Sequence, residues 1–389
     1  MLWTSSCKDE TSPLLLLPTG AGKLRAVATP AETARYRQRF AGTIPDDHFR
    51  QRDGLWLSSI GLGTYLGDAD DATDAASQQA IVAAVRAGCN VIDTAINYRH
   101  QRSERAIGHA LRRLAADHAI QREELFLSTK GGYLPFDGDV PADPAQYFFE
   151  TFIKPGIIST KDVVAGCHCL APKYLQHQLE TSLCNLDVPS VDLYYIHNLE
   201  QQLDEVSREI FRKRLRAAFE MLEQAVKEGK IRAYGIATWN GLRHAPNAKD
   251  FLALEETIAL AREAGGDSHH CRAVQLPYNL AMSEALTLRN QPLNGARVSL
   301  LEAANHFGPL VTSSASLLQG QLTDGLPPDV AQRFAGLQTD AQRAIQFNRS
   351  TPGLHVALVG MKNVVHVAEN LALDRTAPVS PEQFQQLFR

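Results

Sequence analysis

Short apolar runs alternate with longer amphipathic stretches along most of the chain, and this alternation predicts strands and helices in turn. The runs predicted as strands are residues 55–60, 90–93, 125–128, 191–196, 231–236, 272–276, 309–312 and 355–359. The stretches predicted as helices are residues 77–86, 103–114, 174–185, 203–227, 252–264, 300–307 and 365–371. Eight strands with intervening helices predict an α/β fold, a closed parallel (β/α)8 TIM barrel, because crossovers between parallel strands are right-handed.

Two segments depart from this alternation. Residues 131–171 follow the third predicted strand and are rich in glycine, proline and aromatic side chains. So long a connection is usually functional or disordered, and its aromatic content argues against disorder. We therefore expect a long ordered loop at the barrel rim, walling a pocket. Residues 1–54 are expected to be a partly ordered N-terminal extension, loosest over residues 1–22, that precedes a barrel formed by residues 55–389.

Polar side chains stand at or just past the ends of three predicted strands. They are Asp93 and Tyr98, Lys130, and His197. Strand ends of a barrel converge on one rim, which carries the chemistry. A phenol is a weak acid with a reference pKa of about 10, and a nearby ammonium makes it a better proton donor. Lys130 can supply that charge, Asp93 can hold it in place, and His197 can orient a substrate oxygen.

An ordered series of motifs runs through the same region of the chain. The motifs are Gly88-x-Asn90-x-x-Asp93-Thr94-Ala95-x-x-Tyr98, Ser128-Thr129-Lys130, Asp192-Leu193-Tyr194-Tyr195-Ile196-His197, Gly235-Ile236-x-x-Trp239, Val274-Gln275-x-x-Tyr278-Asn279 and Glu369-Asn370. In order and spacing the series resembles the aldo-keto reductase superfamily, from roughly residue 55 to residue 375. The resemblance implies an NADP(H)-dependent oxidoreductase that reduces an aldehyde or ketone to an alcohol. It implies that Tyr98 is the general acid and that Asp93, Lys130 and His197 support it.

The resemblance also implies which residues bind the cofactor and the substrate. Residues implied for NADP(H) binding are Gly63, Thr64, Thr238, Gln275, Ser314, Ser316, Gly320, Gly360, Lys362, His366, Glu369 and Asn370. Residues implied for the substrate pocket are Tyr65, Tyr133, Asn198 and Trp239. Among the cofactor residues, Gln275 matches the amide that holds the nicotinamide carboxamide. Lys362 stands beside a helix start, a position that favours a 2′-phosphate.

Two departures from the family pattern keep other functions open. Ala237-Thr238 stands where the family commonly has Ser-Asn, and residues 313–316 lack the aromatic side chain that stacks on the nicotinamide. A non-catalytic nicotinamide-binding regulator or redox sensor on the same barrel is therefore an alternative to the enzyme. A metal-dependent barrel hydrolase is a further alternative, but such sites commonly begin with paired histidines after the first strand, where this chain has Gly61-Leu62-Gly63.

Composition bounds the partners and the location. A formal net charge of −4 gives no electrostatic reason to expect nucleic acid. The six cysteines lack CxxC spacing, and Cys167-His168-Cys169 offers too few ligands for a typical zinc site. We therefore expect no metal and reduced thiols. No apolar run approaches the roughly 20 residues that span a bilayer, so we expect a cytoplasmic protein whose partner is a small carbonyl compound. The sequence leaves the substrate and the oligomeric state open.

Overall fold

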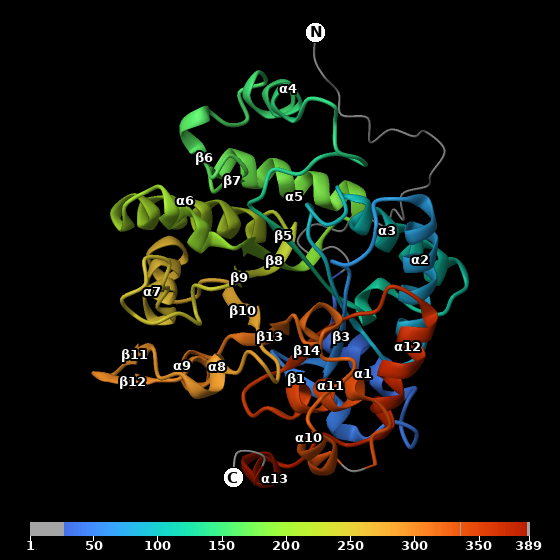
Figure 1. The fold of residues 1–389 in the computed structure, drawn as a ribbon. Coiled ribbons are helices and arrows are strands. Elements are labelled where there is room, and N and C mark those ends of the chain that lie inside the picture. Colours follow the sequence, from blue (N-terminus) through green and yellow to red (C-terminus); the bar gives the residue numbers. More distant parts are fainter. Residues whose placement is uncertain (1–26, 335, 387–389) are drawn as a thin grey trace.

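A closed barrel of eight parallel strands forms the centre of the protein (Figure 1). The computed structural model describes residues 27–334 and 336–386. Around the barrel the strands follow the order β10 (Cys271–Pro277), β13 (Leu310–Ser314), β14 (Val356–Gly360), β3 (Ile60–Gly63), β4 (Val91–Asp93), β5 (Phe126–Gly131), β8 (Val191–His197) and β9 (Ile231–Ala237). Neighbouring strands pair in parallel throughout. The predicted (β/α)8 barrel is therefore confirmed.

Helices surround the barrel on the outside. They include α2 (Asp71–Arg86), α3 (Arg102–Ala116), α5 (Pro172–Leu186), α6 (Arg208–Lys227), α7 (Leu254–Gly265), α9 (Leu300–Phe307), α11 (Asp340–Ser350) and α12 (Val364–Leu371). Figure 1 shows α5, α6 and α7 on one side of the strands and α2, α3 and α12 on the other. The main apolar core lies between helices and strands, and joins Ile81 and Val85 of α2 to Leu62 and Ile92 of the barrel. A second apolar cluster fills the barrel interior.

The prediction of a single strand over residues 55–60 is wrong. Residues Leu55–Ser58 form β2, which pairs antiparallel with β1 (Phe49–Arg52), and the first barrel strand begins only at Ile60. The chain changes direction at Ser59, whose backbone N–H donates to the His48 carbonyl at 2.6 Å.

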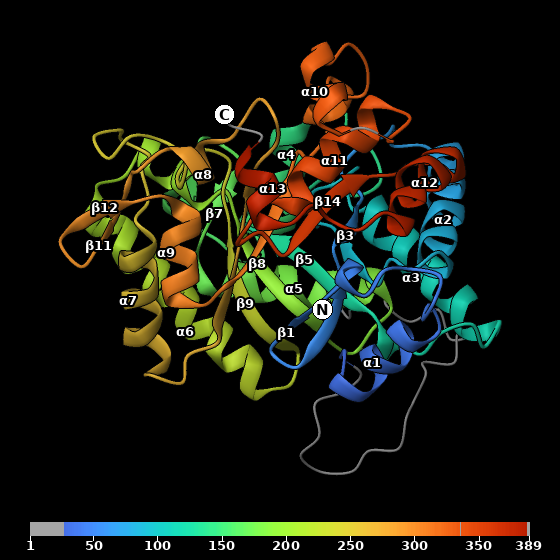
Figure 2. The ribbon, with the colours of Figure 1, turned by 90° about the horizontal axis from the view of Figure 1, so that it is seen from below.

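The hairpin of β1 and β2 and the helix α1 (Pro30–Gln38) lie against the barrel (Figure 2). Ala28, Leu55 and Leu57 join the cluster of the barrel interior, and the Ala28 N–H donates to the buried Asp192 carboxylate at 2.7 Å. This part of the N-terminal region therefore packs as one body with the barrel. The expectation for residues 1–22 lies outside the described residues.

One predicted helix is broken in two. The structure replaces the helix expected over residues 203–227 with the 3₁₀ segment η5 (Leu199–Asp204) and helix α6. Ser207 separates them because its side chain caps the N-terminus of α6, accepting a hydrogen bond from the Ile210 N–H. The elements that the sequence pattern did not predict include α1, α8 (Glu284–Thr287), the hairpin of β11 (Gln291–Leu293) and β12 (Ala296–Val298), α10 (Pro328–Arg333), α11 and α13 (Pro381–Gln386).

The long loop after β5 has a small core of its own. Its elements are α4 (Pro144–Phe148), η3 (Phe149–Ile153), η4 (Thr160–Asp162), β6 (Val163–Val164) and β7 (His168–Cys169). The Phe136 and Phe148 rings stack with centroids 5.0 Å apart, and Phe152 packs edge-on against Tyr174 of α5. Most of the loop's aromatic side chains therefore stabilise the loop itself, whereas Tyr133 contacts His197. Within the described residues, no helix has the length and apolar character needed to cross a membrane.

Candidate active site

The structure brings together the four polar side chains that the sequence singled out. Asp93 ends β4, Lys130 lies in β5 and His197 ends β8, while Tyr98 stands in the turn after β4. The Lys130 ammonium lies 2.5 Å from Asp93 Oδ1 and 3.2 Å from the Tyr98 hydroxyl. The Tyr98 and His197 rings meet edge to face, with centroids 5.8 Å apart. A phenol, an ammonium, a carboxylate and an imidazole thus share one site at the carboxyl ends of the strands.

The Lys130 ammonium is buried and saturated with acceptors. It donates to Asp93 Oδ1, to the Thr94 carbonyl at 2.8 Å and to the Tyr98 hydroxyl. Burial by itself would lower the pKa of Lys130, but the charge of Asp93 and the Tyr98 phenol outweigh it and hold the pKa above its ordinary value. Lys130 therefore stays charged inside the protein.

Burial sets the protonation states of the two rings. Burial raises the pKa of Tyr98. Lys130 lowers this pKa and Asp93 raises it, and the net result lies above the ordinary value. The phenol therefore holds a proton at neutral pH. Burial, Lys130 and His168 hold the pKa of His197 well below its ordinary value, so that imidazole is neutral.

The Asp93 carboxylate has two further donors. Ser128 Oγ donates to Asp93 Oδ2 at 2.7 Å, and the Gln275 amide donates to the same oxygen at 3.0 Å. Sequence reasoning gave Ser128 no role beyond its place in a motif. It assigned Gln275 to a cofactor amide, whereas here the amide also orients the carboxylate that holds Lys130.

The residues implied for cofactor binding lie around the other side of the rim. Gly63, Ser314 and Gly360 end β3, β13 and β14. Thr64 and Thr238 directly follow β3 and β9, Ser316 and Gly320 follow β13, and Lys362 to Asn370 lead into and along α12. Thr64 bonds the Asp93 carbonyl through both its N–H and its hydroxyl.

Several polar atoms of this region are buried without a partner among the described residues. They include the Thr238 hydroxyl and the Asn370 side-chain oxygen. Lys362 is exposed and forms no ion pair with any described residue. By contrast, the Ser316 hydroxyl is already bonded to that of Ser313 at 3.0 Å. Buried unpaired polar atoms are costly unless a ligand or water satisfies them, so this side of the rim suits a polar ligand.

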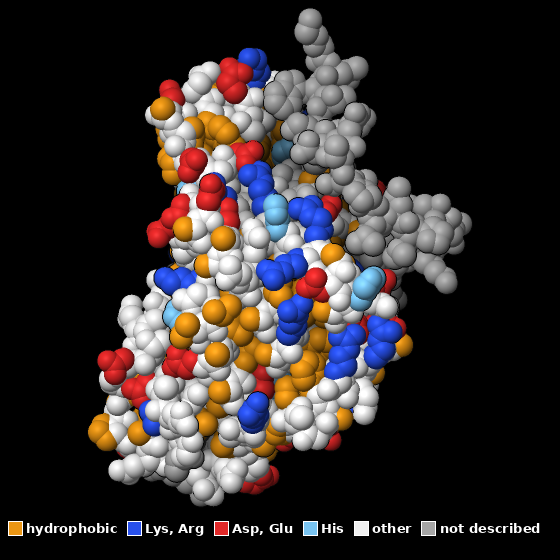
Figure 3. All heavy atoms as spheres, turned by 90° about the vertical axis from the view of Figure 1, so that its right-hand side faces the viewer, with side chains coloured by type: hydrophobic (Ala, Val, Ile, Leu, Met, Phe, Trp, Pro, Cys, Tyr) orange, Lys and Arg blue, Asp and Glu red, His pale blue; other side chains and the backbone are white. Residues whose placement is uncertain are grey.

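Basic side chains are frequent on the face of the protein that includes α12. Figure 3 shows lysine and arginine side chains gathered on the face that carries α2, α3 and α12. Two arginines near α2 and α3 are paired: the buried Arg99 with Asp74, and Arg102 of α3 with Asp71 and Asp74 of α2. Lys362 differs from them because it has no such carboxylate among the residues described.

The four residues implied for the substrate pocket differ in their surroundings. Tyr65 is 55% exposed and packs edge-on against Tyr98. Tyr133 packs in the same way against His197, and its hydroxyl accepts a hydrogen bond from the Asn198 amide at 3.0 Å. Trp239 is 40% exposed and lies two residues past the end of β9. Three of the four therefore adjoin the rings of Tyr98 and His197 directly or through one contact.

Two buried residues near the rim escaped sequence reasoning. Glu200 Oε1 accepts hydrogen bonds from the backbone N–H groups of Trp239 and Asn240 at 2.7 and 2.9 Å, which fixes the turn carrying Trp239. His168 contacts the backbone of His197. Their sequence signal is weak: Glu200 is a lone carboxylate three residues past a strand, and the motif around His168 suggests only a metal ligand. In the described part of the chain, no group of three or more histidine, cysteine, aspartate or glutamate side chains is placed to hold a metal ion.

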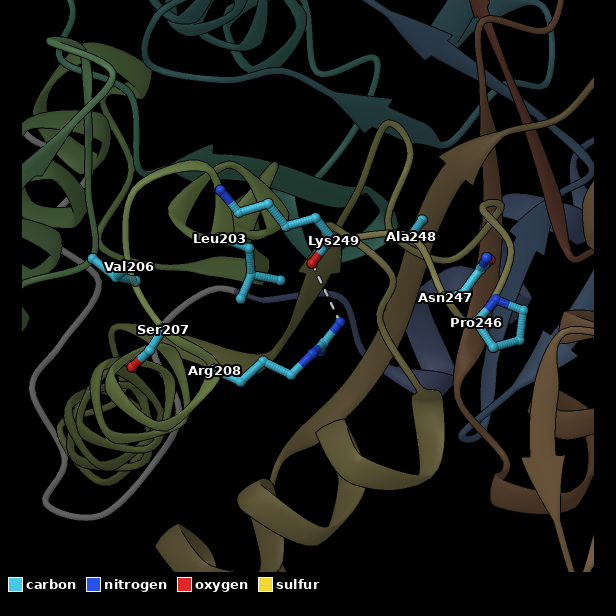
Figure 4. Close-up of a pocket in the computed structure, with 8 residues that line it drawn as sticks. All are labelled: Leu203, Val206, Ser207, Arg208, Pro246, Asn247, Ala248 and Lys249. Atoms are coloured by element: carbon cyan, nitrogen blue, oxygen red, sulfur yellow. Dashed lines mark hydrogen bonds between the residues drawn. The ribbon is translucent and has the colours of Figure 1, made fainter.

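A separate hollow of about 340 Å³ lies between the start of α6 and residues 246–249, and the residues that line it include none of the site residues described above (Figure 4). Its two cationic side chains are already engaged. Arg208 donates to the backbone carbonyls of Lys249 and Phe251, and Lys249 donates to that of Asp204. The hollow therefore offers no evident charged anchor for a ligand.

The family model described as "Aldo/keto reductase family" matches residues 59–280 of this chain. The 6-dehydroglucose reductase of Novosphingobium aromaticivorans is 28% identical over 201 residues, which are 49% of this chain and 51% of that protein. Prostaglandin F synthase 1 of Bos taurus is 25% identical over 197 residues, 48% of this chain and 49% of that protein. The chain thus spans about half the length of these curated relatives.

Solved structures share the fold. An aldo/keto reductase from Klebsiella pneumoniae, crystallised with NADP and acetate, superposes with a TM-score of 0.57 at 24% identity, covering 86% of this chain and 92% of that one. A glycerol dehydrogenase from Gluconobacter oxydans superposes with a TM-score of 0.60 at 18% identity, covering 88% and 95%. At such identities the likeness establishes the barrel fold alone.

Proposed function

The chain belongs to the aldo/keto reductase family, and we propose that it reduces an aldehyde or ketone to an alcohol with NADPH as the reductant. The observation that carries the proposal is the contact between the Lys130 ammonium and the Tyr98 hydroxyl at 3.2 Å, beside a carboxylate that keeps the ammonium charged. A neutral phenol with a cation on its oxygen is equipped to give up a proton and to be stabilised as the phenolate.

The side chains divide the acid chemistry between them. Tyr98 gives its proton to the substrate oxygen as negative charge develops there. Lys130 stabilises the phenolate left behind, and Asp93 keeps Lys130 protonated and aimed at Tyr98. The neutral His197 ring directs an N–H at the same oxygen. Donors fixed in advance toward a developing oxyanion need no rearrangement during the reaction. When bound, NADPH supplies the hydride that the carbonyl carbon receives.

Support for NADP(H) comes from the polar side of the rim. The Thr238 hydroxyl and the Asn370 oxygen are buried and lack partners among the described residues, and both suit a ligand with amide and hydroxyl groups. Lys362 next to the N-terminus of α12 suits a phosphate. The aldo/keto reductase from Klebsiella pneumoniae was crystallised with NADP. Together these features make NADP(H) the cofactor we propose, with Gly63, Ser314, Gly320, Gly360, His366 and Glu369 as further contacts.

The substrate we propose is a small carbonyl compound next to Tyr65, Tyr133, Asn198 and Trp239. The curated relatives are named for dissimilar substrates, a dehydroglucose and a prostaglandin. They favour the reaction class and do not select one compound.

Turnover measured beside binding tests the proposal. We expect the purified protein to bind NADPH more tightly than NADH and to consume it with a reactive aldehyde. Tyr98→Phe, which keeps the ring and removes the acidic hydroxyl, should bind NADPH normally and lose about 10²- to 10⁴-fold in turnover. An equal rate in Tyr98→Phe would overturn the assignment of the acid.

One observation favours a second function, a nicotinamide-binding regulator without turnover. The Gln275 amide proposed for the nicotinamide carboxamide is bonded to Asp93, and Thr238 offers a hydroxyl where relatives commonly offer an amide. Tight NADPH binding with no consumption across a panel of aldehydes and ketones would favour this function over the reductase.

A further inference from the structure

The long loop after β5 returns to the active site at one buried side chain, His168 of β7. The β6–β7 hairpin folds back on β5, so that the Leu134 N–H donates to the Cys167 carbonyl and the Cys169 N–H to the Gly132 carbonyl. His168 is fully buried, and its Nε2 lies 2.7 Å from the backbone oxygen of His197. The loop thereby touches a residue of the proposed proton-donating site.

Neighbouring groups determine which His168 nitrogen carries the proton. Arg214 of α6 donates to the Gln202 side-chain oxygen at 2.6 Å, which turns the amide nitrogen of Gln202 toward His168 Nδ1 at 2.8 Å. An amide nitrogen only donates, so Nδ1 is the acceptor and Nε2 carries the hydrogen. The chain of donors therefore runs from Arg214 through Gln202 and His168 to the His197 carbonyl.

The His197 carbonyl needs this donor because β5 does not supply one. The ladder between β5 and β8 ends with Gly131 opposite Ile196, one residue before His197. Gly132 leaves the space for the imidazole: its φ is +139°, and an added Cβ would lie 2.9 Å from His168 Nε2 and 3.1 Å from the His197 oxygen. A backbone carbonyl left unpaired in a buried site would cost free energy.

We propose that His168 is a positioning residue that fixes His197, and with it the ring of Tyr133, for carbonyl reduction. The Tyr133 ring packs edge-on against both imidazoles, with centroids 5.1 Å away in each case. The inference rests on the proposed reductase function, because His168 contacts no substrate itself and acts only through His197. It also gives the long loop a role, because the loop supplies the N–H donor for the His197 carbonyl.

His168 acts as a neutral donor. Burial lowers its pKa to about 4, although the hydrogen bond to the His197 carbonyl opposes that shift. Its hydrogen bond therefore stays the same through the neutral range.

A double-mutant cycle tests the proposal in the full-length protein. His168→Phe keeps a ring of similar shape and cannot donate. We expect it to lower kcat/KM for an aldehyde about 10- to 100-fold, the size of loss that a small misplacement of a catalytic group produces, and to leave the dissociation constant for NADPH unchanged. In a His197→Ala background the same change should have little further effect. The matched control, His177→Phe, replaces a half-buried histidine of α5 that contacts Phe152 and not the site, and should keep full activity.

Several outcomes would overturn the inference. Losses that multiply in the double mutant would show that His168 does not act through His197. Nitrogen NMR of the wild-type protein that found the proton on Nδ1 of His168 would break the donor chain without reference to turnover. If His168→Phe does not fold, Gln202→Leu takes its place, and it should lower kcat/KM only when His197 is present. If the wild-type protein reduces no carbonyl compound, the proposed function is refuted. The NMR measurement would still test the chain of hydrogen bonds from Arg214 to the His197 carbonyl.

Discussion

The two sides of the barrel rim are built in opposite ways. On the side of β4, β5 and β8, Asp93, Lys130 and Tyr98 satisfy one another's hydrogen bonds. On the side of β9, β14 and α12, Thr238 and Asn370 bury polar atoms that lack partners among the described residues. The first side has exceptions, because His197 Nδ1, the Thr94 hydroxyl and the Asn97 side-chain oxygen are also buried without such partners. The Asp93, Lys130 and Tyr98 cluster is thus assembled by the fold alone, whereas we propose that the other side takes its missing hydrogen bonds from a ligand. We refer to the two as the assembled side and the ligand-dependent side.

That difference has an energetic meaning. A buried ion pair contributes little net stability when intact, because desolvation offsets its attraction, yet removing one partner leaves a buried charge alone. Substitutions on the assembled side should therefore change folding stability as well as rate. Substitutions on the ligand-dependent side should change ligand affinity and leave the fold nearly untouched.

The largest expected effect comes from Lys130→Met. The substitution leaves the Asp93 carboxylate buried without its cation, so we expect the free energy of unfolding to fall by about 3–5 kcal/mol, together with near-complete loss of turnover. Chemical denaturation followed by fluorescence measures the first and NADPH consumption the second. Adding Asp93→Asn removes the lone charge, so the double variant should regain part of the stability and none of the activity. A double variant less stable than Lys130→Met would contradict the view that the pair is a self-contained unit.

The pH profile is the next most sensitive measurement. The protonated phenol is the proposed acid, and the pKa of Tyr98 is raised by burial, so the active form persists to higher pH than for a free tyrosine. We expect kcat/KM for reduction to be level through neutrality and to fall only above about pH 10, the ordinary tyrosine value. His197 stays neutral because its pKa is lowered, so its protonation should add no acid limb at about pH 6.5, the ordinary histidine value. Such a limb, abolished in His197→Ala, would contradict the assignment.

The same contrast explains what the sequence could predict. The barrel and the convergence of Asp93, Lys130 and His197 follow from strand ends, which short apolar runs reveal and which a closed parallel sheet brings to one rim. The predicted start of the first barrel strand was wrong because Leu55 to Ser58 look like any other strand in sequence. Whether such a run pairs with barrel strands or with β1 depends on contacts far along the chain, such as that between Ala28 and Asp192.

Supporting contacts were harder to foresee than the side chains they support. Nothing local in the sequence tells that Ser128 and Gln275 meet on one carboxylate oxygen, since they lie in different strands. The role of His168 could not be predicted for the same reason, because it depends on Gln202 and Arg214, which orient His168 from other elements. A strand pattern predicts the position of a residue in the sheet, but the contacts of its side chain depend on the packing of the whole fold.

A smaller effect is expected at Lys362, on the ligand-dependent side. The side chain is exposed and pairs with no described carboxylate, so Lys362→Ala should leave the free energy of unfolding unchanged. If Lys362 binds the 2′-phosphate, the dissociation constant for NADPH should rise about tenfold, or about 1.4 kcal/mol, while that for NADH stays the same. Lys362→Arg keeps the charge and serves as the control. An equal loss for both cofactors would place Lys362 elsewhere than at the 2′-phosphate.

The smallest expected effect separates the two sides most cleanly. Thr238→Val replaces a buried hydroxyl that has no partner among the described residues with a methyl group of the same shape. Because no internal hydrogen bond is lost, the free energy of unfolding should stay the same or rise slightly. If the hydroxyl binds the cofactor, the dissociation constant for NADPH should rise several-fold, as the loss of one hydrogen bond worth about 1 kcal/mol requires; Thr238→Ser should retain the affinity.

Ser128→Ala is the counterpart of Thr238→Val on the assembled side, since Ser128 donates to Asp93 at 2.7 Å. It should lower the free energy of unfolding by about 1 kcal/mol and leave the dissociation constant for NADPH unchanged. Calorimetry on both variants, each titrated with NADPH, measures the two quantities together. If Thr238→Val loses stability, its hydroxyl has a partner in the folded protein. The rim would then be assembled on both sides, and the contrast between them would disappear.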